Sequence, residues 1–115
     1  MLKVNNDNII AFDVDDTLIT FENKENCELI EISSLDGRYK DYARPLKKHI
    51  DMVKNSKVRG HYVVVWSQGG VNWAEAVVKA LHLEEFVDLI MCKPSWLVDD
   101  IPPNEWTVRL YKEKL

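Results

Sequence analysis

Carboxylates placed close together are the feature of this sequence that could do chemistry. One group lies in the segment Asp13-Val14-Asp15-Asp16-Thr17, directly after an apolar run, and a second pair is Asp99-Asp100. Neighbouring carboxylates repel one another, so they need a bound cation to be stable together. Ligands that are all oxygen favour Mg²⁺ over softer metal ions. The sequence therefore predicts a magnesium site.

Two further polar groups have the chemistry to bind a phosphate. Ser67 is followed by Gln68-Gly69-Gly70 and then by a stretch with helical spacing. A hydroxyl beside such a turn favours phosphate binding, because the N–H groups and the dipole of a helix N-terminus attract an anion. Lys93 could neutralise both a phosphate and a carboxylate. Together these residue types indicate phosphoryl transfer by positioning and charge stabilisation.

Four short apolar runs are expected to form the strands that position these groups: residues 9–12, 62–66, 87–91 and 96–98. The first two runs do not alternate strictly with polar residues, which is typical of parallel strands covered on both faces. In an open parallel sheet, ligands bind beyond the carboxyl ends of the strands. The acids, the serine and the lysine each follow one of these runs, so we expect them at one edge of the sheet.

Stretches with helical spacing separate the expected strands. Apolar residues recur at helical intervals within residues 45–59 and 71–82, and a third helix is expected from near Asn104 to the C-terminus. Strands that alternate with helices predict a three-layer α/β fold with a mostly parallel sheet.

Residues 20–44 break this alternation. Residues 27–32 alternate at period two, Asp36-Gly37 is a turn signal, and residues 38–42 could return as a partner strand. We interpret the segment as a β-hairpin flap that projects from the end of the first strand.

Length and composition limit the classes of function. A chain of 115 residues is long enough for one domain with one hydrophobic core. A net charge of −4 argues against a module that grips nucleic acid through a basic field. No apolar run approaches the ~20 residues that span a bilayer, and the N-terminus lacks the apolar core of a signal peptide. Cys27 and Cys92 form no disulfide or zinc pattern, so we expect a cytoplasmic protein. Because no long apolar run is present, we expect no membrane partner.

The chain resembles the haloacid dehalogenase-like (HAD) superfamily in four segments, which occur in the family's order. Asp13-Val14-Asp15-Asp16-Thr17-Leu18 is similar to the first signature, Asp-x-Asp-x-Thr after an apolar strand. Val63-Val64-Val65-Trp66-Ser67 resembles the second, Lys93 in Met91-Cys92-Lys93-Pro94 the third, and Trp96-Leu97-Val98-Asp99-Asp100 the fourth. The resemblance implies a Rossmann-like core and a phosphatase activity that depends on Mg²⁺.

The resemblance assigns catalytic roles to three residues. Asp13 would attack phosphorus, form an aspartyl-phosphate and bind Mg²⁺. Asp15 would act as general acid and then as general base, with its backbone carbonyl as a metal ligand. Lys93 would stabilise Asp13 and the transferring group.

The resemblance also assigns substrate contacts and further metal ligands. Ser67 would hold a phosphoryl oxygen with Gln68 beside it, and Thr17 would support the loop at the substrate. Asp100 is the preferred further metal ligand and Asp99 supports it, although the two roles could be reversed.

Several other residues favour structural interpretations. Asp16 is expected to form a turn or a cap. His49, His61 and His82 lack the spacing of metal ligands. Trp73 could line the site from the start of a helix, but packing is the favoured interpretation.

Other functions share parts of the pattern. A nucleotide or polynucleotide phosphatase would use the same mechanism on a dedicated substrate. A receiver-like signalling domain, which binds phosphate without being an enzyme, would need an acceptor Asp after the middle strand, where this sequence has Val65-Trp66-Ser67. A degenerate HAD-like binding protein is disfavoured by the intact acids.

The spacing of the signatures leaves no room for a separate cap domain. A hairpin and one helix occupy the interval between Thr17 and Ser67, and about 26 residues separate Ser67 from Lys93. We expect an open site that accepts a phosphorylated substrate, possibly macromolecular in size. Alternatively, a second subunit of a homo-oligomer could supply the lid.

Overall fold

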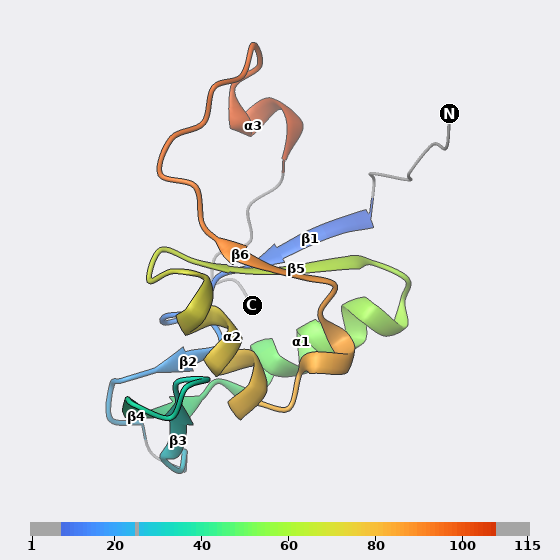
Figure 1. The fold of residues 1–115 in the computed structure, drawn as a ribbon. Coiled ribbons are helices and arrows are strands. Elements are labelled where there is room, and N and C mark those ends of the chain that lie inside the picture. The colour runs from blue at the N-terminus through green and yellow to red at the C-terminus, as the bar shows by residue number, and fades with distance from the viewer. Residues whose placement is uncertain (1–7, 25, 108–115) are drawn as a thin grey trace.

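The computed structural model describes residues 8–24 and 26–107. They form two sheets, with helices packed between and around them (Figure 1). The elements in chain order are β1 (Ile9–Phe12), β2 (Ile19–Thr20), β3 (Ile30–Ser33), β4 (Lys40–Pro45), α1 (Lys47–Val58), β5 (Tyr62–Ser67), α2 (Val71–Ala80), the 3₁₀ helix η2 (Glu84–Phe86), β6 (Leu89–Cys92) and α3 (Pro103–Trp106).

Strands β1, β5 and β6 form a parallel sheet in the order β1-β5-β6. Phe12 pairs with Val65 and Val65 pairs with Ile90, so the three strands end at nearly the same level. Val63, Val64 and Val65 of β5 are all buried, as expected of β-branched residues in a central strand. The parallel sheet predicted from the sequence is therefore confirmed for these three strands.

Strands β2, β4 and β3 form a separate antiparallel sheet in that order. β3 and β4 are the arms of a hairpin with Ile30 opposite Ala43, and Gly37 in its turn has a φ of 74° that favours glycine. The predicted hairpin is confirmed. The sequence pattern missed β2, because its two residues are too few to show a period, yet Thr20 pairs with Arg44 of β4.

Helices α1 and α2 pack on the same face of the parallel sheet (Figure 1). The crossovers from β1 to β5 and from β5 to β6 run in one direction along the sheet, and right-handed crossovers in one direction place their helices on one face. The opposite face carries Ile9, Tyr62 and Leu89, which are exposed. The described residues therefore form an α/β fold but do not include the second helical layer that the sequence pattern predicted.

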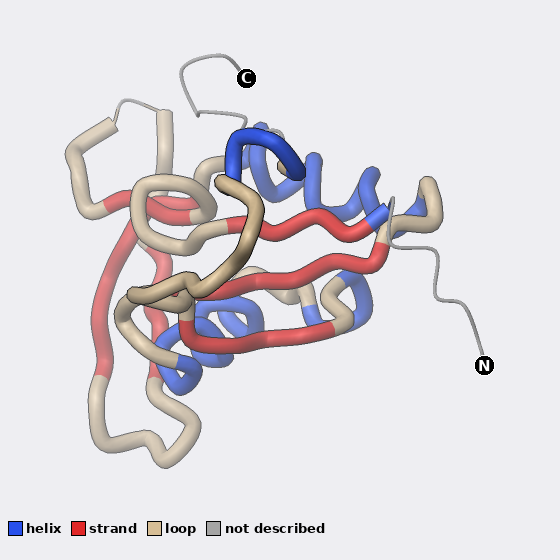
Figure 2. Tube along the Cα trace, turned by 90° about the horizontal axis from the view of Figure 1, so that it is seen from above, coloured by secondary structure: helices blue, strands red, loops and turns tan. Residues whose placement is uncertain are grey.

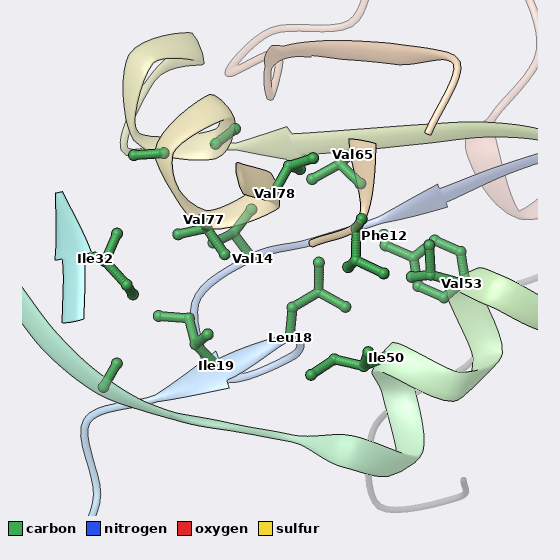
Figure 3. Packing of buried hydrophobic residues seen from close by; sticks show 14 of the residues in the cluster. Phe12, Val14, Leu18, Ile19, Ile32, Ile50, Val53, Val65, Val77 and Val78 are labelled. Carbon is green, nitrogen blue, oxygen red and sulfur yellow. The ribbon is translucent and has the colours of Figure 1, made fainter. Parts of the chain in front are cut away.

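One cluster of buried side chains joins the parallel sheet, both helices and the flap (Figure 3). Phe12 of β1 packs in this cluster with Val53 of α1 and Val77 of α2. Ile32 of β3 belongs to the same cluster, so the flap is packed onto α2 through apolar contacts. The core thus fixes the antiparallel sheet beside the carboxyl end of β1.

The segment after β6 leaves the sheet. It rises on the side away from α1 and α2 and leads into α3, and in the view from above it passes in front of the strands (Figures 1 and 2). Residues 96–98 form no strand, and Trp96 and Val98 are 90% and 99% exposed. The predicted fourth strand is therefore wrong. The reason is the connection length, because three residues lie between Cys92 and Trp96 whereas another parallel strand needs a crossover of about a dozen or more.

The third predicted helix begins close to its expected start. α3 spans Pro103–Trp106, and residues 108–115, which the prediction also included, lie outside the described part. Within the described ranges, no helix has the length and apolar character needed to cross a membrane.

Candidate functional site at the carboxyl edge of the parallel sheet

The three parallel strands bring Asp13, Ser67 and Lys93 to one edge of the sheet. Phe12, Val65 and Ile90 lie side by side in the register. Asp13, Ser67 and Lys93 follow them by one to three positions and therefore lie at a similar level. The Lys93 N–H donates to the Ser67 carbonyl at 2.9 Å, which places the backbone of the lysine directly beside the serine. This edge is the one at which parallel sheets bind ligands.

The loop that carries Asp13, Asp15 and Asp16 is held together by hydrogen bonds to one carbonyl group. The carbonyl of Val14 accepts hydrogen bonds from the N–H groups of Thr17, Leu18 and Ile19 at 3.2, 2.9 and 3.3 Å. Val14 and Leu18 are fully buried. Because Val14 is turned into the core, its neighbours on either side lie toward the surface, with Asp13 half-buried and Asp15 exposed.

Asp16 has the structural role expected from the sequence. Its φ of 59° lies in the left-handed region that Asp tolerates better than most residues. Its N–H donates to the Ile19 carbonyl at 2.8 Å, and its carboxylate accepts from the Thr20 hydroxyl at 3.0 Å. These bonds close the turn between β1 and β2.

Helix α1 anchors the same loop from below. The imidazole of His49 is buried, and its Nδ1 lies 2.6 Å from the Thr17 carbonyl. A carbonyl can only accept, so Nδ1 carries the proton in this bond. The Leu46 N–H also donates to the Leu18 carbonyl at 2.9 Å. His49 is thus a packing residue, as expected, and it additionally fixes the acid-bearing loop.

The turn after β5 contains the expected phosphate-binding group in a covered position. Ser67 is 1% exposed, and its hydroxyl oxygen accepts from the Gly69 N–H at 3.0 Å. Gln68 is exposed beside it. Gly70 has a φ of 105° and precedes α2, whose first turn has neither a side-chain cap nor an acidic residue. Within the described part of the chain, no side chain therefore caps the first N–H groups of α2.

Trp73 contacts the site, although the sequence favoured a packing role for it. Its indole Nε1–H donates to Oδ1 of Asp15 at 2.9 Å. Its ring also stacks on Phe21, with centroids 6.2 Å apart and an angle of 18° between the planes. Two signals pointed toward this contact. An indole N–H usually finds an acceptor, and Trp73 lies in the first turn of the helix that follows Ser67.

The second acidic pair is not brought to this edge. Asp99 and Asp100 are exposed in the segment after β6, and Asp99 accepts from the Ile101 N–H at 3.1 Å. This local hydrogen bond is the main cause that lowers the pKa of Asp99 from its usual value. No cluster of at least three His, Cys, Asp or Glu side chains arranged to hold a metal occurs among the described residues.

In comparisons with known proteins, no family model, no curated protein and no solved structure matches this chain.

Proposed function

We propose that the chain is a phosphohydrolase that acts through an aspartyl-phosphate on Asp13, in a single minimal HAD-like domain. The observation that carries the proposal is the meeting of Asp13, Ser67 and Lys93 at the carboxyl edge of neighbouring parallel strands. A carboxylate, a hydroxyl-bearing turn and an ammonium at one ligand-binding edge are the groups that phosphoryl transfer needs. The first three sequence signatures of the HAD superfamily support the same reaction, whereas the fourth forms no strand and its two acids are exposed after β6.

The proposed reaction has two chemical steps. In the first, a carboxylate oxygen of Asp13 attacks phosphorus, the bond from phosphorus to the leaving oxygen breaks, and Asp15 gives its proton to that oxygen. In the second, Asp15 takes a proton from water, the resulting hydroxide attacks the same phosphorus, and the Asp13 carboxylate is released with inorganic phosphate. Asp15 is exposed and Asp13 half-buried on the same loop, so both can reach a phosphoryl group above it.

Two groups are available to balance the charge of the phosphoryl group. Helix α2 has ten residues, its N-cap is Gly70, and its first turn has no acidic side chain. Its dipole and free N–H groups would favour the phosphoryl oxygens. Lys93 would supply a positive charge from the neighbouring strand end. The Ser67 hydroxyl is covered and accepts a hydrogen bond from Gly69, so we assign to it the role of shaping this turn. Its hydroxyl proton remains to be donated to the substrate.

The acid loop suits Mg²⁺ in the manner in which proteins often hold this ion. Mg²⁺ keeps several waters and is commonly bound through one or two carboxylates plus substrate phosphates. Asp13 and the backbone carbonyl of Asp15 would hold the ion, which would offset the negative charge of the phosphoryl oxygens. Asp100, with Asp99 in support, would add a ligand only if the segment after β6 moved toward the loop.

A receiver-like signalling domain is the weaker candidate. In the parallel sheet of the described residues, the middle strand is β5, and it ends in Ser67 rather than in an acid. The acid-bearing loop instead follows β1. A phosphoacceptor at the middle strand is therefore lacking.

The proposal is tested by hydrolysis of an aryl phosphate by the purified chain. We expect turnover that requires Mg²⁺ and that a chelator abolishes. Absence of turnover on aryl phosphate and on a panel of nucleotides, sugar phosphates, phosphopeptides and end-phosphorylated DNA would contradict it. The same panel, combined with light scattering, would separate an open monomer acting on macromolecules from an oligomer that is selective for a small phosphate.

A further inference from the structure

The indole of Trp73 contacts three separate parts of the candidate site. Its N–H group reaches the carboxylate of Asp15 at 2.9 Å. One face of the ring stacks on Phe21, which directly follows β2. Its Cδ1 lies against the turn after Ser67, close to the backbone of Gly69.

The ring of Trp73 lies close to Gly69. A Cβ atom built on Gly69 would lie 3.0 Å from Cδ1 of Trp73 and 3.2 Å from the Ser67 hydroxyl oxygen. The backbone of Gly69 does not have the positive φ that favours glycine, in contrast to Gly70 at 105°. An alanine at position 69 would therefore crowd the indole and the serine hydroxyl, which would have to move by a few tenths of an ångström to admit it.

We propose that Trp73 is a positioning residue for Asp15 and selects which of its carboxylate oxygens exchanges the proton. The inference rests on the proposed function and deepens it. An indole N–H can only donate, so it occupies Oδ1 whether the carboxyl group is ionised or protonated. Oδ2 is left as the oxygen that gives its proton to the leaving group and later takes one from water.

The need for such a contact follows from the exposure of Asp15. Val14 turns this side chain toward solvent, and the only hydrogen bond that its carboxylate makes among the described residues is the one from Trp73. An exposed carboxylate without a partner samples several rotamers. Holding it in one orientation contributes to catalysis because a misplaced proton donor acts less efficiently.

Leaving groups of different basicity test this role. p-Nitrophenolate departs without a proton, whereas the alkoxide of an alkyl phosphate such as glycerol 2-phosphate must be protonated as it departs. We use kcat/KM, which covers the steps up to departure of the leaving group and so excludes hydrolysis of the aspartyl-phosphate. Trp73→Phe keeps an aromatic ring against Phe21 but removes the N–H. We expect kcat/KM to fall at least about tenfold more for the alkyl phosphate than for p-nitrophenyl phosphate.

Two further variants separate positioning from packing. Gly69→Ala leaves Trp73 in the sequence but pushes on its ring, so it should cause the same selective loss on the alkyl phosphate. The double variant should lose little more than either single one, because both act on one contact. Trp106→Phe in the exposed α3 is the matched control, and its ratio of the two kcat/KM values should equal that of the wild type.

The outcomes distinguish this inference from the function on which it rests. Equal losses on both substrates in Trp73→Phe, with wild-type turnover present, would overturn the positioning role and leave the phosphohydrolase proposal standing. A wild-type chain that hydrolyses neither of these substrates nor any member of the panel described above would overturn the proposed function. A selective loss in Trp73→Phe that Gly69→Ala does not share would contradict the part of the inference that places the ring through Gly69.

Discussion

The two acidic segments of this chain look alike in sequence and differ in the structure. Both have an apolar stretch followed by adjacent aspartates. In the first, Val14 and Leu18 are fully buried and the loop between them is closed by hydrogen bonds. In the second, Trp96 and Val98 are 90% and 99% exposed.

The difference shows what places an acid in a site. Asp13 and Asp15 are positioned by Val14, which lies between them and is buried in the core. His49 additionally binds the Thr17 carbonyl of the same loop. Among the described residues, Asp99 has local partners: its carboxylate accepts a hydrogen bond from the N–H of Ile101, two residues away. The position of an acidic doublet therefore depends on whether the neighbouring apolar residues are buried, and the sequence pattern alone does not show that burial.

The largest effect is expected from Asp13→Asn. The substitution removes the attacking charge and keeps the shape of the side chain, so kcat on an aryl phosphate should fall by more than about 10³-fold with little change in Tm. The matched control is Asp51→Asn on α1, which should retain activity. Turnover close to wild type in Asp13→Asn would remove the first acidic segment from the mechanism.

The stability of the two segments should differ almost as strongly. Leu18→Ala empties a fully buried position beside the acids and should lower the free energy of unfolding by about 2–5 kcal/mol. Trp96→Ala removes a larger side chain from an exposed position and should change it by less than about 0.5 kcal/mol. Chemical denaturation of both variants measures the comparison. A cost for Trp96→Ala equal to that of Leu18→Ala would mean that the second segment is packed in solution.

A smaller effect is expected at Asp100. If the segment after β6 contributes a ligand, Asp100→Asn should raise the Mg²⁺ concentration for half-maximal activity about tenfold while leaving kcat at saturating Mg²⁺ nearly constant. Asp36→Asn in the flap turn serves as the control for charge. An Mg²⁺ requirement equal to that of the wild type would mean that the segment stays away from the loop, as the structure has it.

The smallest effect concerns Asp88, an acid fixed by partners distant in sequence. Its carboxylate accepts from the Lys57 ammonium at 2.6 Å and from the Val63 N–H at 2.7 Å, and the bond from Lys57 is the main cause that lowers its pKa from 3.8. A carboxyl group whose pKa is lower in the folded state than in the unfolded state stabilises the fold at pH values above its unfolded-state pKa. This stabilisation is lost as the pH falls through the folded-state pKa. Asp88→Asn should cost about 1 kcal/mol at pH 7.

The pH dependence of that cost is the measurement. The difference in unfolding free energy between the wild type and Asp88→Asn should be constant from pH 7 to about pH 5 and should shrink as the pH falls below 3.8. Asp99→Asn, whose bond is local and exposed, should show a smaller difference at every pH. A pH-independent cost for Asp88→Asn would show that its effect does not arise from the ionised carboxylate.

Local patterns predicted the elements whose signals lie within a few residues. The helical spacing in α1 and α2, the apolar runs of β1 and β5, and the turn at Asp36-Gly37 were sufficient for their assignment. The two-residue strand β2 had no period to detect. The strand expected at 96–98 was inferred from apolar character without regard to the short connection from β6.

The candidate site divides in the same way. That Asp13, Ser67 and Lys93 share one edge followed from the rule for parallel sheets, and the register agrees with it. The contact of Trp73 with Asp15 joins residues 58 positions apart, and no periodicity reports such a pair. Likewise, the contact of His49 with the Thr17 carbonyl depends on how α1 crosses beneath the loop, which is set by tertiary packing.

The most direct test of the central claim is to trap the covalent intermediate. The chain would be mixed with Mg²⁺ and an aryl phosphate, quenched, and treated with borohydride, which reduces an acyl phosphate of aspartate to homoserine. Mass spectrometry of the peptides then locates the modified residue. We predict homoserine at position 13 and nowhere else, with no such product in Asp13→Asn. Reduction at Asp99, Asp100 or another acid, or turnover with no reducible intermediate at all, would contradict the assignment of Asp13 as the nucleophile.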